Sequence, residues 1–350
     1  MRNRRAALSG PPPPMRIAVD AMGGDDAPGP VVEGALAAAR HLDLEVLLVG
    51  PTATLEAELA RHPDALSLPV RIVEAPEVVG MADAPVASLR RKPRASVKVA
   101  AELVARGEAD AMFSAGSTGA SVMAAYAAFG MLPGVDRPAL ATTIPTRAGR
   151  PAVLLDAGAN ADCRPHHLLQ FGVMGAVFTR VVLGVPAPRV GLLSIGEEET
   201  KGNDLTREAH RLLKASGLNF IGNVEARDVY TGLADVIVCD GFTGNIALKI
   251  SEGLVETVEA LLGEELRGTF SSQVGYLLSR RAFRRFRRRV DYSEYGGAPL
   301  LGVAGLSIVG HGRSSAKAVR NAVAMAARFA GSDFLSRVEH EIAAAAAPQS

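Results

Sequence analysis

The sequence predicts an α/β protein, in which a three-layer, doubly wound and mainly parallel sheet carries helices on both faces. Three observations support this fold class. Short apolar runs typical of buried strands alternate with helical patterns along most of the chain. No internal period of about 20–50 residues indicates a solenoid. Small and polar residues gather where the apolar runs end, which is where such a sheet binds its ligands.

The alternation places the expected elements in order. In the first half, strands are expected at residues 16–20, 44–49, 70–73 and 109–113, and helices at 31–40, 54–61, 96–105 and 122–129. In the second half, strands are expected at residues 139–144, 152–156, 189–195, 219–224 and 235–240, and helices at 166–182, 205–216, 245–262 and 314–329. Strands separated by helices indicate βαβ crossovers.

The ends of the chain differ in composition from the rest. Residues 1–14 finish in four prolines and predict a disordered extension. We expect residues 15–335 to form a single α/β domain and the alanine-rich residues 336–350 to be a tail.

The overall composition is that of a globular protein with a sizeable core. Of the 350 residues, 48% are hydrophobic and 21% are charged. No uninterrupted apolar span reaches about 18 residues, so we expect no transmembrane helix. Cys163 and Cys239 lie far apart and lack metal-ligand spacing, which is typical of a reduced, cytoplasmic protein. Cys239 stands in an apolar run and is expected to be packed rather than nucleophilic.

Residues 111–121 are the turn around which the predicted site is organised. An apolar run breaks into Ser-Ala-Gly-Ser-Thr-Gly and then enters a helical pattern. Such a turn directs unpaired backbone N–H groups and a helix dipole toward one point, which suits a phosphate. We therefore assign phosphate binding to Ser117, Thr118 and Gly119. The alternative is an ordinary connection in which Ser117 or Thr118 caps the helix.

We use the term polar corner for a turn of small and polar residues that follows an apolar run. Residues 111–121 contain one polar corner and four others occur in the chain, and we expect all five to meet at one edge of the sheet. Asp20 and Gly24 belong to the first corner, and Asn160 to another; we expect these residues to bind phosphate or substrate. In the corner at residues 240–245, Thr243 and Asn245 can cap a helix or orient a carbonyl and a phosphate.

The remaining assignments concern charged side chains. Lys201 lies between glycines, and we expect it to neutralise a phosphate or an oxyanion; the alternative is a solvated lysine balanced by neighbouring glutamates. Asp240 can hold a lysine, accept a proton, or simply end a strand. Residues 310–317 open the last helical pattern and can offer His311, Arg313 and Ser314 to an anion. No Gly-x-Gly-x-x-Gly, Walker A or HExxH motif occurs, so we expect neither a cofactor nor a metal.

Residues 254–292 depart from the alternation and predict a protruding helical hairpin. Residues 280–289 contain seven arginines and no acid, although the formal net charge of the whole chain is only +1. Three roles remain open: dimerisation, a membrane-surface anchor, and docking of an acidic protein. Nucleic-acid binding is disfavoured, because no base-stacking surface accompanies the arginines. The residues assigned to this surface are Arg280, Arg281, Phe283, Arg284, Arg285 and Phe286.

These motifs together resemble a known family. VDAMGGDDAP, SAGSTGA, LDAGAN, SIGEEETKGN, CDGFTGN followed by LK, and GGAPLLGV followed by HGRSSAKA occur in the order seen in the PlsX-type phosphate acyltransferases of bacterial phospholipid synthesis. The resemblance runs from about Met15 to Phe329. The N-terminal extension and the dense arginines depart from the family pattern, but neither touches the motifs.

The resemblance implies a fold like that of phosphotransacetylases and isocitrate/isopropylmalate dehydrogenases, and a homodimer. It implies that inorganic phosphate and a fatty acyl group on acyl carrier protein give acyl phosphate, which a membrane glycerol-3-phosphate acyltransferase then consumes. On this basis Lys201 and Asn245 would stabilise the oxyanion, and the protein would be cytoplasmic, at the inner face of the membrane. A phosphotransacetylase that uses acyl-CoA, a dehydrogenase and a non-enzymatic membrane scaffold are the alternatives.

Overall fold

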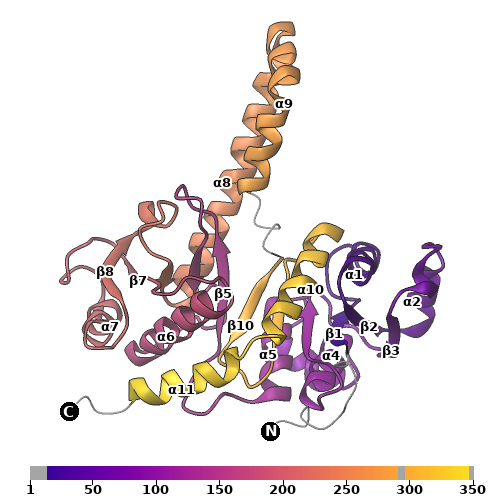
Figure 1. Ribbon diagram of the computed structural model, residues 1–350, viewed down its shortest axis with the longest axis horizontal. Coiled ribbons are helices and arrows are strands. Elements are labelled where there is room, and N and C mark those ends of the chain that lie inside the picture. Colours follow the sequence, from indigo (N-terminus) through magenta and orange to yellow (C-terminus); the bar gives the residue numbers. More distant parts are fainter. Residues whose placement is uncertain (1–13, 291–295, 347–350) are drawn as a thin grey trace.

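The computed structural model describes residues 14–290 and 296–346, and it contains one sheet flanked by helices (Figure 1). The strands are β1 (Met15–Asp20), β2 (Leu44–Gly50), β3 (Val70–Glu74), β4 (Ala111–Ser114), β5 (Ala139–Ile144), β6 (Ala152–Leu155), β7 (Val190–Ser194), β8 (Phe220–Glu225), β9 (Val236–Val238), β10 (Ala298–Leu301) and β11 (Ser307–Val309). The helices are α1 (Gly29–His41), α2 (Thr52–Leu59), α3 (Pro85–Arg91), α4 (Ser96–Ala105), α5 (Thr118–Phe129), α6 (Pro165–Val181), α7 (Asp204–Lys214), α8 (Gly241–Gly268), α9 (Phe270–Val290), α10 (Ala316–Ala330) and α11 (Phe334–Ala346).

The sheet confirms the predicted fold class. Its strand order is β3-β2-β1-β4-β11-β10-β5-β6-β9-β7-β8. Among the described residues, seven of the ten strand pairings are parallel, and the three antiparallel ones join β11, β10, β5 and β6 at the centre. The sheet therefore consists of two parallel halves joined through a short antiparallel section.

Alternation along the strands produces the three layers. In β1, Ile17 and Val19 lie in the hydrophobic cluster that includes residues of α1 and α10, whereas Ala18 lies in the cluster formed with α4 and α5. Successive side chains of a strand point to opposite faces, so each face buries its own set of helices. The same arrangement continues in the second half, where α6 covers the face shared with α1 and α10.

Several expectations need correction. Residues 336–346 were expected to be a tail, but they belong to α11, which packs on α6 and buries Val338 and Ile342. The i, i+4 spacing of these side chains is the signal that the alanine-rich composition obscured. β10, β11 and α3 were not expected either. Residues 1–13 of the predicted extension, and residues 347–350, lie outside the described part of the chain.

The predicted hairpin is present and projects away from the body (Figure 1). α8 begins at Gly241, earlier than expected, and α9 returns beside it. Exposed apolar side chains run along both helices, among them Leu261, Leu277 and Leu278. In the described residues, no helix combines the length and apolarity needed to cross a membrane.

Candidate active site

A cavity of about 610 Å³ opens where the two halves of the sheet meet. Its wall comes from the turns after β1, β4, β6 and β11 and from the first turns of α8 and α10. Of the predicted site residues, Thr118, Asn245 and His311 line it directly. Four of the five polar corners thus contribute a wall residue, and this part of the predicted convergence is present.

The turn between β4 and α5 has the geometry expected of an anion site. Ser117 is the N-cap residue, but its side chain makes no capping hydrogen bond within the described structure. The first N–H groups of α5 therefore lack a side-chain acceptor there, and Gly116 and Thr118 line the cavity. Gly119 has a different role: a Cβ there would lie 2.8 Å from Cγ of Pro85, so this position is a close contact between α5 and α3.

The corner after β1 supports the cavity wall. Asp20 is buried, and its carboxylate accepts a hydrogen bond from Ser114 Oγ at 2.7 Å. Burial raises the pKa of Asp20 above its usual range. Gly24 packs against the loop that follows β11, since a Cβ would lie 3.2 Å from the carbonyl oxygen of Gly312. Asp25 N–H donates to the same carbonyl at 2.8 Å, so this corner joins two walls of the cavity.

The corner after β6 is held together by the carboxylate of Asp156, which accepts several hydrogen bonds. Asp156 accepts hydrogen bonds from several backbone N–H groups, including that of Asn160 at 2.8 Å. The Asn160 amide donates to Asp156 and to the carbonyl oxygen of Pro138. Asn160 therefore holds the turn, and Ala157 and Gly158 are the members of this corner that line the cavity.

α8 contributes the side chains that are best placed to act on a substrate. Asp240 is its N-cap and accepts from both N and Oγ1 of Thr243 at 2.8 Å. These two predicted residues thus start the helix and do not line the cavity. One face of α8 then presents Asn245, Lys249 and Glu252 to the cavity, because residues three and four apart lie on the same side of a helix.

A charged cluster surrounds Lys249. Its Nζ lies 2.9 Å from Glu252 Oε2 and 3.4 Å from His311 Nε2. The Arg313 N–H donates to His311 Nδ1 at 3.2 Å, and the Arg313 guanidinium pairs with Glu256 at 3.0 Å. Burial lowers the pKa of His311, which favours the neutral ring. Among the described residues, the lysine and arginine side chains in the wall are those of Lys249 and Arg313.

Lys201 lies in a different environment. It follows β7, which is separated from β6 by β9, and it is exposed and absent from the cavity wall. Its N–H donates to the carbonyl oxygen of Glu198 at 3.0 Å. The neighbouring Glu199 pairs with Lys214 on α7. The loop at residues 196–204 therefore resembles a solvated charged surface.

Sequence reasoning overlooked Lys249 and Glu252, whereas Arg313 was considered beside His311 as a contact for an anion. The available signal was spacing: Lys249 follows Asn245 by four residues on a predicted helix and must share its face. Gly296 and Gly297 also line the cavity and were not assigned a role. They precede β10, which was itself not expected.

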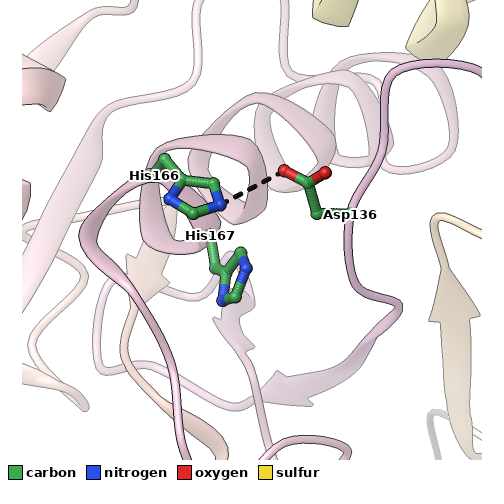
Figure 2. A group of neighbouring side chains, drawn as sticks. All are labelled: Asp136, His166 and His167. Atoms are coloured by element: carbon green, nitrogen blue, oxygen red, sulfur yellow. Dashed lines mark ion pairs between the residues drawn. The ribbon is translucent and has the colours of Figure 1, made fainter.

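Asp136, His166 and His167 lie together at the start of α6, with ligand atoms within 4.8 Å of one another (Figure 2). His166 Nε2 lies 3.3 Å from Asp136 Oδ2, and His167 Nδ1 accepts the Arg164 N–H at 3.0 Å. Burial lowers the pKa of His167, and its neutral ring then carries the proton on Nε2, leaving no lone pair for a cation. We interpret this group as the capping structure of α6.

The hairpin residues assigned to a partner or membrane surface differ in their exposure to solvent. Arg280, Arg281 and Arg285 are exposed. The ring of Phe283 is half-buried against Tyr276, with centroids 5.3 Å apart. Phe286 is half-exposed near the base of the hairpin. The side chain of Arg284 and residues 291–292 lie outside the described part.

Comparison with known proteins identifies the family. A protein family described as "Fatty acid synthesis protein" matches residues 15–337. The phosphate acyltransferase of Nitratidesulfovibrio vulgaris (strain DP4) is 54% identical over 330 residues, which cover 94% of this chain and 95% of the relative. The phosphate acyltransferase of Geotalea daltonii is 50% identical over 316 residues, covering 90% and 91%.

A phosphotransacetylase from Streptococcus pyogenes has the same fold. Its TM-score is 0.63 at 19% identity, with 91% of this chain and 94% of that chain covered. This likeness concerns the fold, whereas the curated relatives also share about half of their sequence with this chain. The chain belongs to the family of fatty acid synthesis proteins, together with these phosphate acyltransferases.

Proposed function

We propose that this protein is an acyltransferase that moves a fatty acyl group from acyl carrier protein to inorganic phosphate. The product, an acyl phosphate, would supply phosphatidic acid synthesis. The observation that carries this proposal is the extended identity with phosphate acyltransferases, 54% over 94% of the chain for the Nitratidesulfovibrio relative. The cavity at the junction of the sheet halves supports it, because its wall combines an uncapped helix start with two cations.

Phosphate would bind at the start of α5, where Gly116 and Thr118 supply donors. Lys249 would neutralise its charge, and the neutral ring of His311 beside it would contact one oxygen. Arg313 lies close enough in the wall to assist. In this arrangement the role that we expected of Lys201 falls to Lys249, with Asn245 beside it.

The reaction would be a direct displacement. A phosphate oxygen attacks the thioester carbonyl carbon, the C–S bond breaks, and the proton of hydrogen phosphate ends on the leaving thiol. Asn245 and Lys249 stabilise the oxyanion of the tetrahedral intermediate. A cysteine nucleophile is disfavoured, because burial raises the pKa of Cys163 to about 12 and that of Cys239 well above its usual range. The direct displacement uses no redox cofactor and no metal.

The test is a discontinuous assay for acyl phosphate formed from acyl carrier protein thioester and phosphate. We expect formation to depend on both substrates. The same assay with acyl-CoA separates the proposal from a phosphotransacetylase, which the fold likeness to the Streptococcus pyogenes enzyme makes the second candidate. A higher kcat/KM with acyl-CoA than with the carrier-protein thioester would favour the phosphotransacetylase.

The hairpin supports a proposal about partners. Acyl carrier protein is acidic in this class of reaction, and the exposed Arg280, Arg281 and Arg285 offer it a complementary surface. The exposed apolar stripe, including Leu261, Leu277 and Leu278, suits a second copy in a homodimer or the cytoplasmic face of the membrane. There the product would reach the membrane glycerol-3-phosphate acyltransferase.

Two double variants distinguish docking of the carrier protein from contact with the membrane. One reverses the charge of two arginines, and the other removes two apolar side chains. Arg281→Glu with Arg285→Glu should raise KM for the carrier-protein thioester and leave KM for phosphate unchanged if the arginines dock the carrier. Leu277→Asp with Leu278→Asp should abolish co-sedimentation with anionic liposomes while turnover persists if the stripe rests on the membrane. Sedimentation analysis of the second variant reports whether the stripe also holds a dimer together.

A further inference from the structure

A second cavity, of about 570 Å³, adjoins the first. Thr143, Leu248 and Glu252 line both cavities, so the two are direct neighbours. The rest of its wall is mainly apolar and comes from β5, the segment before β9, and both arms of the hairpin. The side chains that matter here are Ile144, Pro145, Tyr230, Leu254, Val255 and Phe286.

The shape of the sheet creates this opening. β10 pairs with Leu140 and Ala139 only, whereas β5 continues to Ile144 against β6. Beyond Leu140, no strand pairs with this side of β5 among the described residues. Thr143 lies on this unaccompanied part of β5, at the point where the polar and apolar cavities meet.

Thr143 has an unmet hydrogen-bonding requirement. Its side chain is 4% exposed, and within the described structure its Oγ1 has no hydrogen-bond partner. A buried hydroxyl without a partner is destabilising, and at the junction of two cavities it is placed where a bound ligand can complete the bond. A hydroxyl can donate to a carbonyl oxygen, and the thioester of the substrate carries one.

We infer that the second cavity holds the fatty acyl chain and that Thr143 Oγ1 donates to the thioester carbonyl oxygen. This inference rests on the proposed acyl transfer to phosphate. With phosphate at the start of α5 in the first cavity and the alkyl chain in the second, the carbonyl carbon must lie at their junction. The volume lies within the range of about 300–1,000 Å³ typical of small-molecule sites, and the apolar wall excludes water from the chain.

Val255 and Val258 allow a matched test of the chain position. Both lie on α8, but Val255 lines the second cavity and Val258 lies outside it, with 45% exposure. Val255→Phe narrows the cavity, so kcat/KM for palmitoyl carrier protein relative to hexanoyl carrier protein should fall about tenfold. Val258→Phe should leave this ratio unchanged. An equal loss with both donors in Val255→Phe would overturn the assignment.

A binding measurement keeps this test independent of turnover. cis-Parinaric acid, a fluorescent fatty acid, should bind the wild-type protein and bind about tenfold more weakly to Val255→Phe, with Val258→Phe unaffected. If the wild-type protein forms no acyl phosphate from any donor, the proposed function fails. This pattern of probe binding still decides where a fatty acyl chain binds. Equal binding to both variants contradicts the assignment.

Thr143→Val and Thr143→Ser test the carbonyl contact. Removal of one oxyanion donor costs about 10²–10³-fold in kcat, so Thr143→Val should lose about that factor in kcat/KM for the acyl donor, with KM for phosphate unchanged. Thr143→Ser keeps the hydroxyl and should restore most of the rate. The thermal midpoint of Thr143→Val should not fall, because the lost hydroxyl has no protein partner. Undiminished turnover in Thr143→Val would overturn this contact.

Discussion

The corner between β7 and α7 and the corner between β9 and α8 share one local design and differ in their surroundings. Each joins a strand to a helix through a polar N-cap, Asn203 in the first and Asp240 in the second, with glycines before the N-cap in the first and after it in the second. Each also carries a lysine, Lys201 in the first corner and Lys249 two turns into α8. Only the second lysine reaches the cavity.

The difference comes from the neighbouring strand. The turn after β6 closes against α8, where a Cβ on Gly241 would lie 2.5 Å from the carbonyl oxygen of Asn160. The corner after β7 faces solvent, and ion pairs such as Glu197 with Arg227 cover it. A polar corner at a strand end therefore becomes a binding site only when a second corner closes against it.

The largest expected effect distinguishes the two lysines. Lys249→Ala should lower kcat/KM for acyl phosphate formation by about 10²–10³-fold, because a charge next to the reacting groups is lost in a water-poor cavity. Lys201→Ala should stay within about threefold of the wild type, since an exposed charge contributes little. The measurement is the discontinuous assay with phosphate varied. The opposite ranking would return the role to Lys201 and break the comparison.

The next effect is on stability. A Cβ on Gly244 would lie 1.9 Å from the backbone oxygen of Asp156, which cannot move aside, so Gly244→Ala should lower the free energy of unfolding by about 3 kcal/mol. In the other corner, a Cβ on Gly202 would meet Oγ1 of Thr206 at 2.0 Å, and this side chain can rotate. Gly202 has φ +101°, so its substitution by alanine should still cost about 1–2 kcal/mol. Urea unfolding measures both, and equal losses would mean that the two corners are packed alike.

The N-caps should behave alike. Asp240→Ala and Asn203→Ala should each cost about 1 kcal/mol in unfolding free energy, because each side chain accepts an N–H of the first helical turn. Asp240→Asn should keep both stability and turnover, since asparagine caps as well as aspartate. A stable Asp240→Asn protein with greatly reduced turnover would show that Asp240 has the chemical role that its sequence position suggested.

The smallest expected effect concerns pH. Burial lowers the pKa of His311, so below about pH 6.5 the unfolded chain binds more protons at this residue than the folded protein does. The free energy of unfolding should therefore decrease as the pH falls from about 7 to 5. His311→Gln should reduce this dependence, as followed by thermal unfolding across the pH series. An unchanged slope would mean that His311 is not desolvated.

Most of the parallel part of the sheet could be predicted, because its strands are continuous apolar runs separated by clear helical patterns. β10 and β11 could not, since Ala298–Leu301 and Ser307–Val309 are short and are surrounded by glycines. The antiparallel centre of the sheet was missed for the same reason. α11 was missed because alanine-rich composition does not show which face is buried.

The site was predicted at the level of corners more than of side chains. Local composition identifies turns that contain glycines. It pointed to Thr118 and Asn245, and it led to the same interpretation of the loop that contains Lys201. The discriminating information is strand order, which places β7 away from β4 and β6. Lys249 could have been predicted from helical spacing alone. The position of Thr143 at the junction of the two cavities depends on β10 pairing with only part of β5.

The central position of β10 and β11 has a consequence for how the protein is made. Met112 of β4 pairs with Ser307, and Leu140 of β5 pairs with Leu300, so among the described strands the two halves of the sheet are joined through β10 and β11. During synthesis, both halves leave the ribosome long before these residues do, with β4 and β5 as open edges. Joining them is a late, non-local step. Because the wall of the cavity draws on both halves, a nascent chain cannot assemble this wall until residues 298–309 have been translated.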